Sequence, residues 1–180
     1  MCVVLETDRL QLRAITINDA QDFFELDSNP NVHRYLGKKP VKTLEQSKGY
    51  INDVLSQYKR YNIGRSAVIL KKTGEFLGWS GLKYETTVRD YAYYDIGYRF
   101  KEQFWGKGYA KESAIASLKY GFENLGLPKI CGGAEVDNIA SNKILSGIGL
   151  QYVETFDFED EPHHWYELEN NNTPRNLKSY

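Results

Sequence analysis

Cysteine is scarce in this chain: Cys2 and Cys131 are the only two in 180 residues, and they lie far apart in the sequence. Two cysteines form neither a disulfide framework nor a cysteine-based metal site. We therefore expect no bound metal and a reducing, cytoplasmic setting. Cys131 stands in an apolar, strand-like run, where a cysteine normally packs as a small core residue.

Long apolar runs and a strong charge of one sign are also lacking. No stretch approaches the roughly 20 apolar residues that span a membrane. The N-terminus has neither the basic start nor the apolar run of a signal peptide. The formal net charge is -1, which does not favour non-specific binding to nucleic acid. We expect neither a membrane nor a nucleic acid as a partner.

The chain does contain an alternation of strand-like and helix-like segments, within the usual length of one domain. We expect a single domain over residues 1–170 and a flexible tail over 171–180. The order predicts an α/β (α+β) fold: a mixed, mostly antiparallel sheet of about six to seven strands with helices on both faces. Strands are expected at 10–14, 66–70, 76–84, 91–100, 129–136, 152–158 and 165–169, and helices at 18–27 (capped by Asn18), 44–60 (a Thr43/Gln46 capping box), 110–124 and 140–146.

A glycine-rich turn, Gln103–Ala110, connects the strand at 91–100 to the helix at 110–124. Free backbone N–H groups at a helix start bind anions, and the helix dipole favours negative charge there. A P-loop is excluded because Gly108, and not Ser or Thr, follows Lys107. A dinucleotide fingerprint is excluded because Lys111 stands where its third glycine is required. The turn therefore predicts a different phosphate-bearing ligand.

The pattern Gln-x-x-Gly-x-Gly over Gln103–Gly108 resembles the acyl-CoA pyrophosphate loop of the GNAT superfamily of N-acetyltransferases. Two further segments carry the resemblance. Asn138–Leu150 is similar to the family's Asn-x-x-Ser helix, and Leu5–Arg13 resembles the opening strand of one branch. That branch acetylates the N-termini of ribosomal proteins, among other amines. The three motifs follow in the family's order and cover the chain from Leu5 to Glu169.

The resemblance implies acetyl-CoA as cosubstrate. Its pantetheine arm would lie in a wedge where the strand before the loop and the strand at 130–135 splay apart. The residues implied in binding it are Tyr98, Arg99, Phe100, Gln103, Trp105, Gly106, Lys107, Gly108, Tyr109, Ala110, Asn138, Ser141 and Lys143. Simpler roles stay open: Asn138 as a helix cap, Trp105 as a packing residue and Lys143 as a solvated lysine.

Acyl transfer to an amine requires a base, because a protonated amine cannot attack a thioester. Asp95, on the strand that leads into the loop, is the first candidate; the alternative is that it pairs with a neighbouring Arg or Lys. Glu161 and His164 are reserve bases. The family supplies an acid from a tyrosine or serine after the Asn138 position. No tyrosine follows before Tyr152, so Ser141 is the candidate, and its alternative role is a second capping hydroxyl. A backbone N–H near Tyr98 or Arg99 would stabilise the oxyanion.

These features predict direct acetyl transfer from acetyl-CoA to a primary amine in a ternary complex, with a protein N-terminus as the favoured acceptor. A small cationic amine, such as a polyamine or aminoglycoside, is the first alternative, and a catalytically idle acyl-CoA-binding sensor is the second. The acidic cluster Asp157, Glu159, Asp160 and Glu161 would suit a cationic acceptor, or it is a solvated edge. The resemblance also suggests a homodimer.

Overall fold

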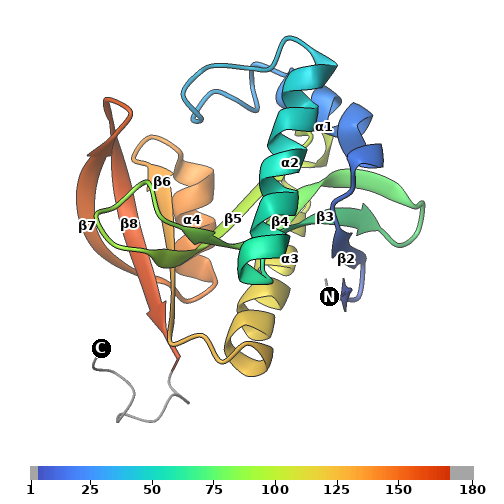
Figure 1. Cartoon of the computed structure of the whole chain (residues 1–180). Coiled ribbons are helices and arrows are strands. Elements are labelled where there is room, and N and C mark those ends of the chain that lie inside the picture. The colour runs from blue at the N-terminus through green and yellow to red at the C-terminus, as the bar shows by residue number, and fades with distance from the viewer. Residues whose placement is uncertain (1–3, 171–180) are drawn as a thin grey trace.

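The fold is seen in a computed structural model that describes residues 4–170. One eight-stranded sheet runs through it in the order β1-β2-β3-β4-β5-β6-β8-β7 (Figure 1). The strands are β1 (Leu5–Glu6), β2 (Leu10–Ala14), β3 (Arg65–Leu70), β4 (Glu75–Glu85), β5 (Tyr93–Phe100), β6 (Lys129–Glu135), β7 (Gln151–Phe158) and β8 (Glu161–Glu169). The helices are α1 (Ala20–Asp27), α2 (Leu44–Tyr61), α3 (Tyr109–Lys119) and α4 (Ile139–Gly147), with short turns η1 (Ile17–Asp19), η2 (Glu102–Phe104) and η3 (Tyr120–Asn124).

The predicted alternation of strands and helices is confirmed, with several local corrections. The sheet has eight strands because Leu5–Glu6 pairs with β2, and β8 begins at Glu161. Thr16, not Asn18, precedes the first helical turn, where its N–H donates to Asp19 Oδ2 at 2.7 Å. The predicted helix at 110–124 is α3 followed by a π-helical turn, η3. The Thr43 capping box is present, and the predicted tail at 171–180 lies outside the described residues.

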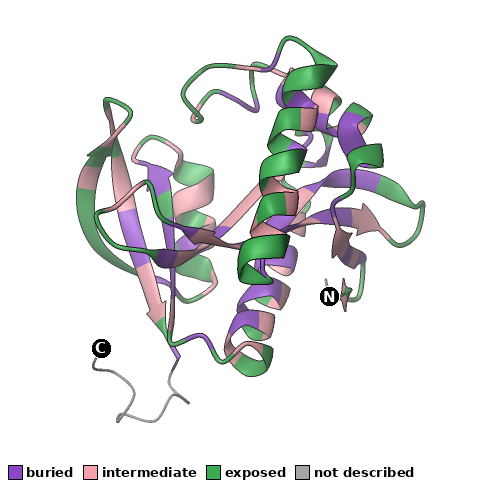
Figure 2. Cartoon of the chain, in the orientation of Figure 1, coloured by how far each residue is buried: buried purple, intermediate pink, exposed green. Residues whose placement is uncertain are grey.

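The helices cover both faces of the sheet, as expected. Successive strand residues point to opposite faces, so Trp79 packs with α1 and α2 while Leu82 packs with α3 and α4. In Figure 2 buried residues follow the central strands β3 to β6, whereas much of α2 is exposed. Within residues 4–170, no helix has the length and apolar character needed to cross a membrane.

The sheet opens between its two central strands. β5 stays paired with β4 along its whole length, and β6 with β8. β5 and β6 run parallel and pair only at Asp95 and Cys131. Beyond that point the two strands separate, which confirms the wedge that the sequence resemblance implied.

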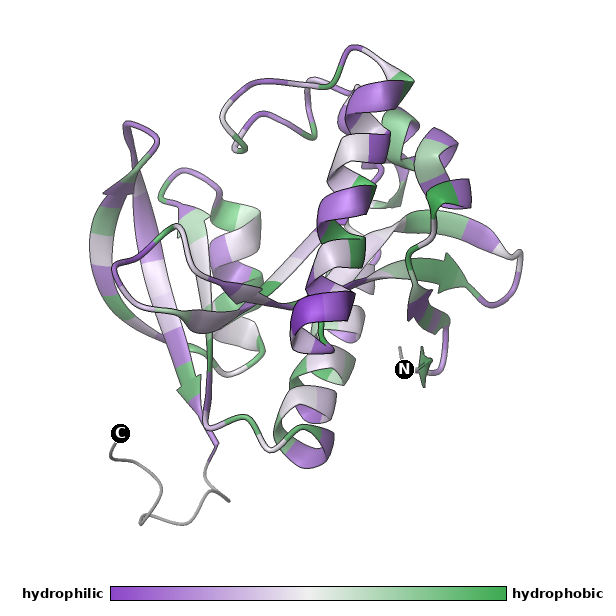
Figure 3. Ribbon diagram, in the orientation of Figure 1, coloured by the Kyte–Doolittle hydropathy of each residue, from purple (hydrophilic) through white to green (hydrophobic). Residues whose placement is uncertain are grey.

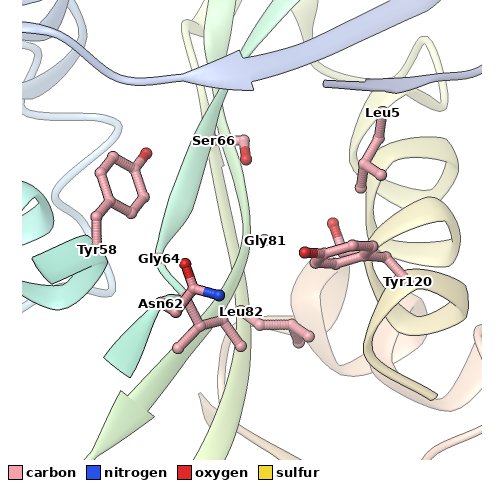
Figure 4. A pocket seen from close by; sticks show the side chains of 10 residues that line it. Leu5, Tyr58, Asn62, Gly64, Ser66, Gly81, Leu82 and Tyr120 are labelled. Carbon is pink, nitrogen blue, oxygen red and sulfur yellow. The ribbon is translucent and has the colours of Figure 1, made fainter. Parts of the chain in front are cut away.

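A small pocket lies elsewhere in the fold, among residues from β1, the end of α2, β3, β4 and α3 (Figure 4). Tyr58 and Tyr120 face one another across it, with Leu82 between them. Its volume is about 40 Å³, which is room for one or two water molecules and not for a cofactor.

The loop that joins β4 to β5 is held by one carboxylate. Glu85 Oε1 accepts hydrogen bonds from the N–H groups of Thr86 and Thr87, each at 2.9 Å, and from the Thr87 hydroxyl at 2.7 Å. Lys83 pairs with its other oxygen. Burial raises the pKa of Glu85, but the hydrogen bonds and the charge of Lys83 outweigh burial and lower the pKa to about 2.

We predict that Glu85→Gln destabilises the protein at pH 7 by about 1–2 kcal/mol, because it removes a charged acceptor of several hydrogen bonds. A lowered pKa contributes stability above the ordinary value of 4.5, and this contribution is lost as the pH falls toward 2. Urea unfolding should therefore show the difference shrinking from pH 5 to pH 3. Glu75→Gln, an exposed position on β4, is the control, and a pH-independent difference would contradict the assignment.

Candidate functional site

A cavity of about 760 Å³ lies at the open end of the wedge. Its walls come from four places: the end of β5 with the loop that follows, the first turn of α3, the start of α4, and the segment between α1 and α2. The lining residues include Tyr98, Arg99, Phe100, Trp105, Gly106, Gly108, Tyr109, Ala110, Asn138, Ser141 and Lys143, all of them predicted. Gln103 and Lys107, which were also predicted, lie on the same loop but are not among the lining residues.

The loop before α3 has the geometry of an anion site. Gly106 and Gly108 adopt φ values of +73° and +81°, which favour glycine. A Cβ at Gly106 would meet no other protein atom within 4 Å, so the space beside it is open. Gly108 is the N-cap of α3 and has no side chain to satisfy the first N–H groups of the helix. These groups, with the nearby Lys111, fit a phosphate.

Arg9, which lies near the start of the chain, contacts this loop with its side chain. Its guanidinium donates to the Lys107 carbonyl oxygen at 3.0 Å and pairs with Glu112 at 2.6 Å. The Arg9 guanidinium also lies over the Tyr109 ring, at 4.6 Å from its centroid. Trp105 is fixed as well, because its indole N–H donates to the Phe100 carbonyl at 2.8 Å while about half of the residue stays exposed. Side chains from outside and inside the loop therefore hold its backbone at two points.

The start of α4 forms the opposite wall. Asn138 Oδ1 accepts from the Ser141 N–H at 3.1 Å, so its capping role is confirmed. The Tyr98 hydroxyl donates to the Ser141 carbonyl oxygen at 3.2 Å and so connects β5 to α4 across the wedge. Burial raises the pKa of Tyr98, which keeps its hydroxyl protonated. Lys143 lies on the same wall.

Asp95 stands where β5 and β6 part, on the sheet face opposite Tyr98. Arg65 binds its carboxylate and donates to its carbonyl oxygen at 2.9 Å, so the pairing that was the alternative role is present. The Arg65 guanidinium lies flat over Gly97, where a Cβ would come within 2.6 Å of Nη2. Burial raises the pKa of Asp95, and the positive charge of Arg65 opposes that rise. Asp95 is not among the cavity-lining residues.

The two reserve bases lie away from the cavity. His164 Nδ1 is 3.1 Å from Asn142 Oδ1. The Asn142 amide nitrogen already donates to three carbonyls, so this oxygen accepts and His164 donates. Glu161 is paired with Lys38 at 2.7 Å. The acidic residues around it form the turn between β7 and β8, which is hydrophilic in Figure 3 and contributes nothing to the cavity wall.

The segment between α1 and α2 was missed by sequence reasoning. Asn31, Val32, Arg34, Tyr35 and Leu36 line the cavity from it. This segment shows neither hydrophobic periodicity nor a recognisable motif. The one indication of a functional role is its length, because long connections between helices are often functional.

A buried ion pair lies beneath this segment. Asp27 pairs with Arg99 at 2.6 Å, and His33 Nε2 is 3.5 Å from the same oxygen. Burial raises the pKa of Asp27, but His33 and Arg99 outweigh it and hold the pKa below its usual value. Asp27 therefore stays ionised and fixes the Arg99 side chain at the cavity wall.

The lining residues belong to both sides of the sheet. Tyr98, Lys111 and Ser141 come from the α3/α4 side, whereas Arg99 and the segment at 31–36 belong to the α1/α2 side. The cavity therefore has walls from both sides of the sheet.

Comparison with known proteins agrees with this geometry. Residues 9–151 match the family model described as an acetyltransferase (GNAT) domain. The chain is 34% identical over 151 residues to the "Uncharacterized N-acetyltransferase YoaA" of Bacillus subtilis, covering 84% of each protein.

Two solved structures share the fold. A GNAT-family acetyltransferase from Bacillus anthracis superposes with a TM-score of 0.78 at 23% identity, covering 94% of this chain and all of that one. RimL, a ribosomal L7/L12 alpha-N-protein acetyltransferase in complex with coenzyme A, gives 0.80 at 16% identity, covering 95% and 100%. Since the family model matches most of the chain, the protein belongs to the GNAT family of acetyl-CoA-dependent N-acetyltransferases.

Proposed function

We propose that the protein transfers the acetyl group of acetyl-CoA to a primary amine by direct attack in a ternary complex, with a protein N-terminus as the acceptor. The observation that carries this proposal is the cavity at the wedge, whose lining extends from the glycine-rich start of α3 to the segment at 31–36. Walls on both sides of the sheet would let a thioester and an amine approach each other from opposite faces.

The residues at the α3 end fit acetyl-CoA. The N–H groups of Tyr109 and Ala110 and the ammonium of Lys111 would hold its phosphates, with Lys143 on the facing helix. Gln103 and the carbonyl and N–H groups of Tyr98 to Phe100 are proposed contacts from the resemblance. Acetyl-CoA supplies the activated acyl group, and the protein supplies position and a path for the proton.

Asp95 is the proposed base and Ser141 the proposed acid. Asp95 stands at the apex of the wedge on the face from which the acceptor would enter, and its raised pKa suits a proton acceptor. A covalent route through Cys131 is disfavoured, because burial raises the pKa of its thiol to about 12 and the residue is fully buried.

A protein N-terminus is favoured over a polycationic small molecule for a physical reason. The acidic turn between β7 and β8, which suited a polycation, lies outside the cavity wall, and its Glu161 is paired with Lys38. Among the described lining residues, Glu102 is the single carboxylate, and both of its oxygens accept from the amides of Asn29 and Asn31. A polycation would find few free carboxylates there.

We predict that Gly106→Ala weakens acetyl-CoA binding about tenfold or more in calorimetry, because a side chain would displace the phosphate from the loop. Gly126→Ala is the matched control: Gly126 also has positive φ and open space around it, but it lies outside the cavity. Each variant should lose about 1 kcal/mol of stability. Equal binding by both variants, or equal binding of ATP, would argue against the loop.

We predict that Asp95→Asn lowers kcat about 10²–10⁴-fold, as expected for loss of a general base. The base works when deprotonated, so kcat of the unmodified enzyme should rise with pH through the raised pKa of Asp95. This rise of kcat with pH should be absent in the Asp95→Asn variant.

Arg65→Gln is the control, since it breaks the same ion pair but keeps the carboxylate. Because Arg65→Gln removes a positive charge beside Asp95, the rise of kcat with pH should shift to higher pH, while most of the activity remains. If both variants lose stability and activity to the same extent, Asp95 has a structural role only.

We predict that Ser141→Ala lowers kcat about tenfold to a hundredfold with unchanged acetyl-CoA affinity. The Asn138 cap uses the Ser141 backbone N–H, so the helix start should survive. A weakened affinity without a change in kcat would assign Ser141 to binding. Complete absence of turnover over a broad panel of amines, with intact acetyl-CoA binding, would instead support the acyl-CoA sensor.

A further inference from the structure

The hydroxyl of Tyr98 reaches the part of the cavity where helix α4 lacks a tyrosine. Between Ile139 and Gly147 the helix carries no tyrosine. Tyr98 comes instead from β5 and extends across the wedge to the Ser141 carbonyl. Both residues line the cavity. A tyrosine hydroxyl therefore lies beside α4, although Tyr98 precedes Ser141 by 43 residues in the sequence.

The hydrogen bond that Tyr98 makes is one that a ligand could replace. Its length of 3.2 Å exceeds the usual 2.7–2.8 Å of an O–H···O bond. The carbonyl it contacts belongs to the first turn of a helix, where the i→i+4 ladder supplies a donor independently of Tyr98. The hydroxyl proton is therefore free to turn toward another acceptor in the cavity without leaving a buried group unsatisfied.

We propose that Tyr98 is a second catalytic residue, which donates a hydrogen bond to the sulfur of acetyl-CoA as the thiolate leaves. The inference rests on the proposed acetyl transfer. In that step the amine nitrogen forms a bond to the acetyl carbon, the carbon–sulfur bond breaks, and its electron pair goes to sulfur. The ammonium proton passes to Asp95. Tyr98 keeps its proton and stabilises the negative charge on sulfur.

Partial donation, and not full proton transfer, follows from the acidity of the two groups. A thiol has a pKa of about 8.5 and an unperturbed tyrosine about 10. Burial raises the pKa of Tyr98 further, so its proton stays on oxygen when the thiolate forms. A buried donor aimed at developing charge stabilises the transition state more than the same bond does in water.

The test is Tyr98→Phe, which removes one oxygen atom and keeps the ring. Kinetics are measured with acetyl-CoA and with its selenoester analogue, whose selenolate is a more stable leaving anion. We expect kcat to fall about 10–100-fold with acetyl-CoA but less than about threefold with the selenoester. The dissociation constant of acetyl-CoA, measured by calorimetry, should stay within about twofold.

Tyr94→Phe is the matched control. Tyr94 lies on the same strand and packs on the same face, but it is not among the cavity-lining residues. It should leave kcat unchanged with both donors. Equal losses with the two donors in Tyr98→Phe, or a loss explained by weaker acetyl-CoA binding, would overturn the proposal and make Tyr98 a packing residue. No turnover by the unmodified protein with either donor would remove the proposed function, and the inference with it.

Discussion

The separation of β5 from β6 is the constraint on which the rest of the structure depends. Each strand keeps its full ladder on its outer side, β5 with β4 and β6 with β8, but they meet only at Asp95 and Cys131. Backbone groups in the opening then face one another without a ladder, and buried groups of this kind need partners. A ligand with its own amides would supply them, which is the role proposed here for acetyl-CoA. Tyr98, reaching from β5 to α4, spans this opening with a side chain.

Charged side chains on the opposite face of the sheet are held in place by ion pairs and by glycine. Arg65 lies over Gly97 and binds Asp95, while Arg99 binds Asp27. Buried ion pairs contribute little net stability, but removal of one partner is costly. Their value here is positional: they fix a carboxylate at the apex of the wedge and a guanidinium at the cavity wall.

The wall at 31–36 is joined to the rest of the molecule at both ends. Glu102, next to the glycine-rich loop, accepts hydrogen bonds from Asn29 and Asn31, and Lys38 pairs with Glu161 at the start of β8. The segment at 31–36 is therefore connected to the region just before the glycine-rich loop.

The sequence alone determined the features that local chemistry decides. The glycines at 106 and 108 predicted a turn before a helix, Thr43 and Gln46 predicted a capping box, and a helix cap was one role left open for Asn138. All three are present. These depend on backbone conformation and near neighbours, so periodicity and spacing reveal them.

Only the tertiary structure decided which distant residues meet. Asp95 pairs with Arg65 because β3, β4 and β5 are adjacent in the sheet, and Gly97 leaves room for the guanidinium. The cavity wall at 31–36 and the contact of Tyr98 with α4 arise in the same way, from packing across long sequence separations. Such contacts are not encoded in any local pattern, since they depend on strand order and on where two strands part.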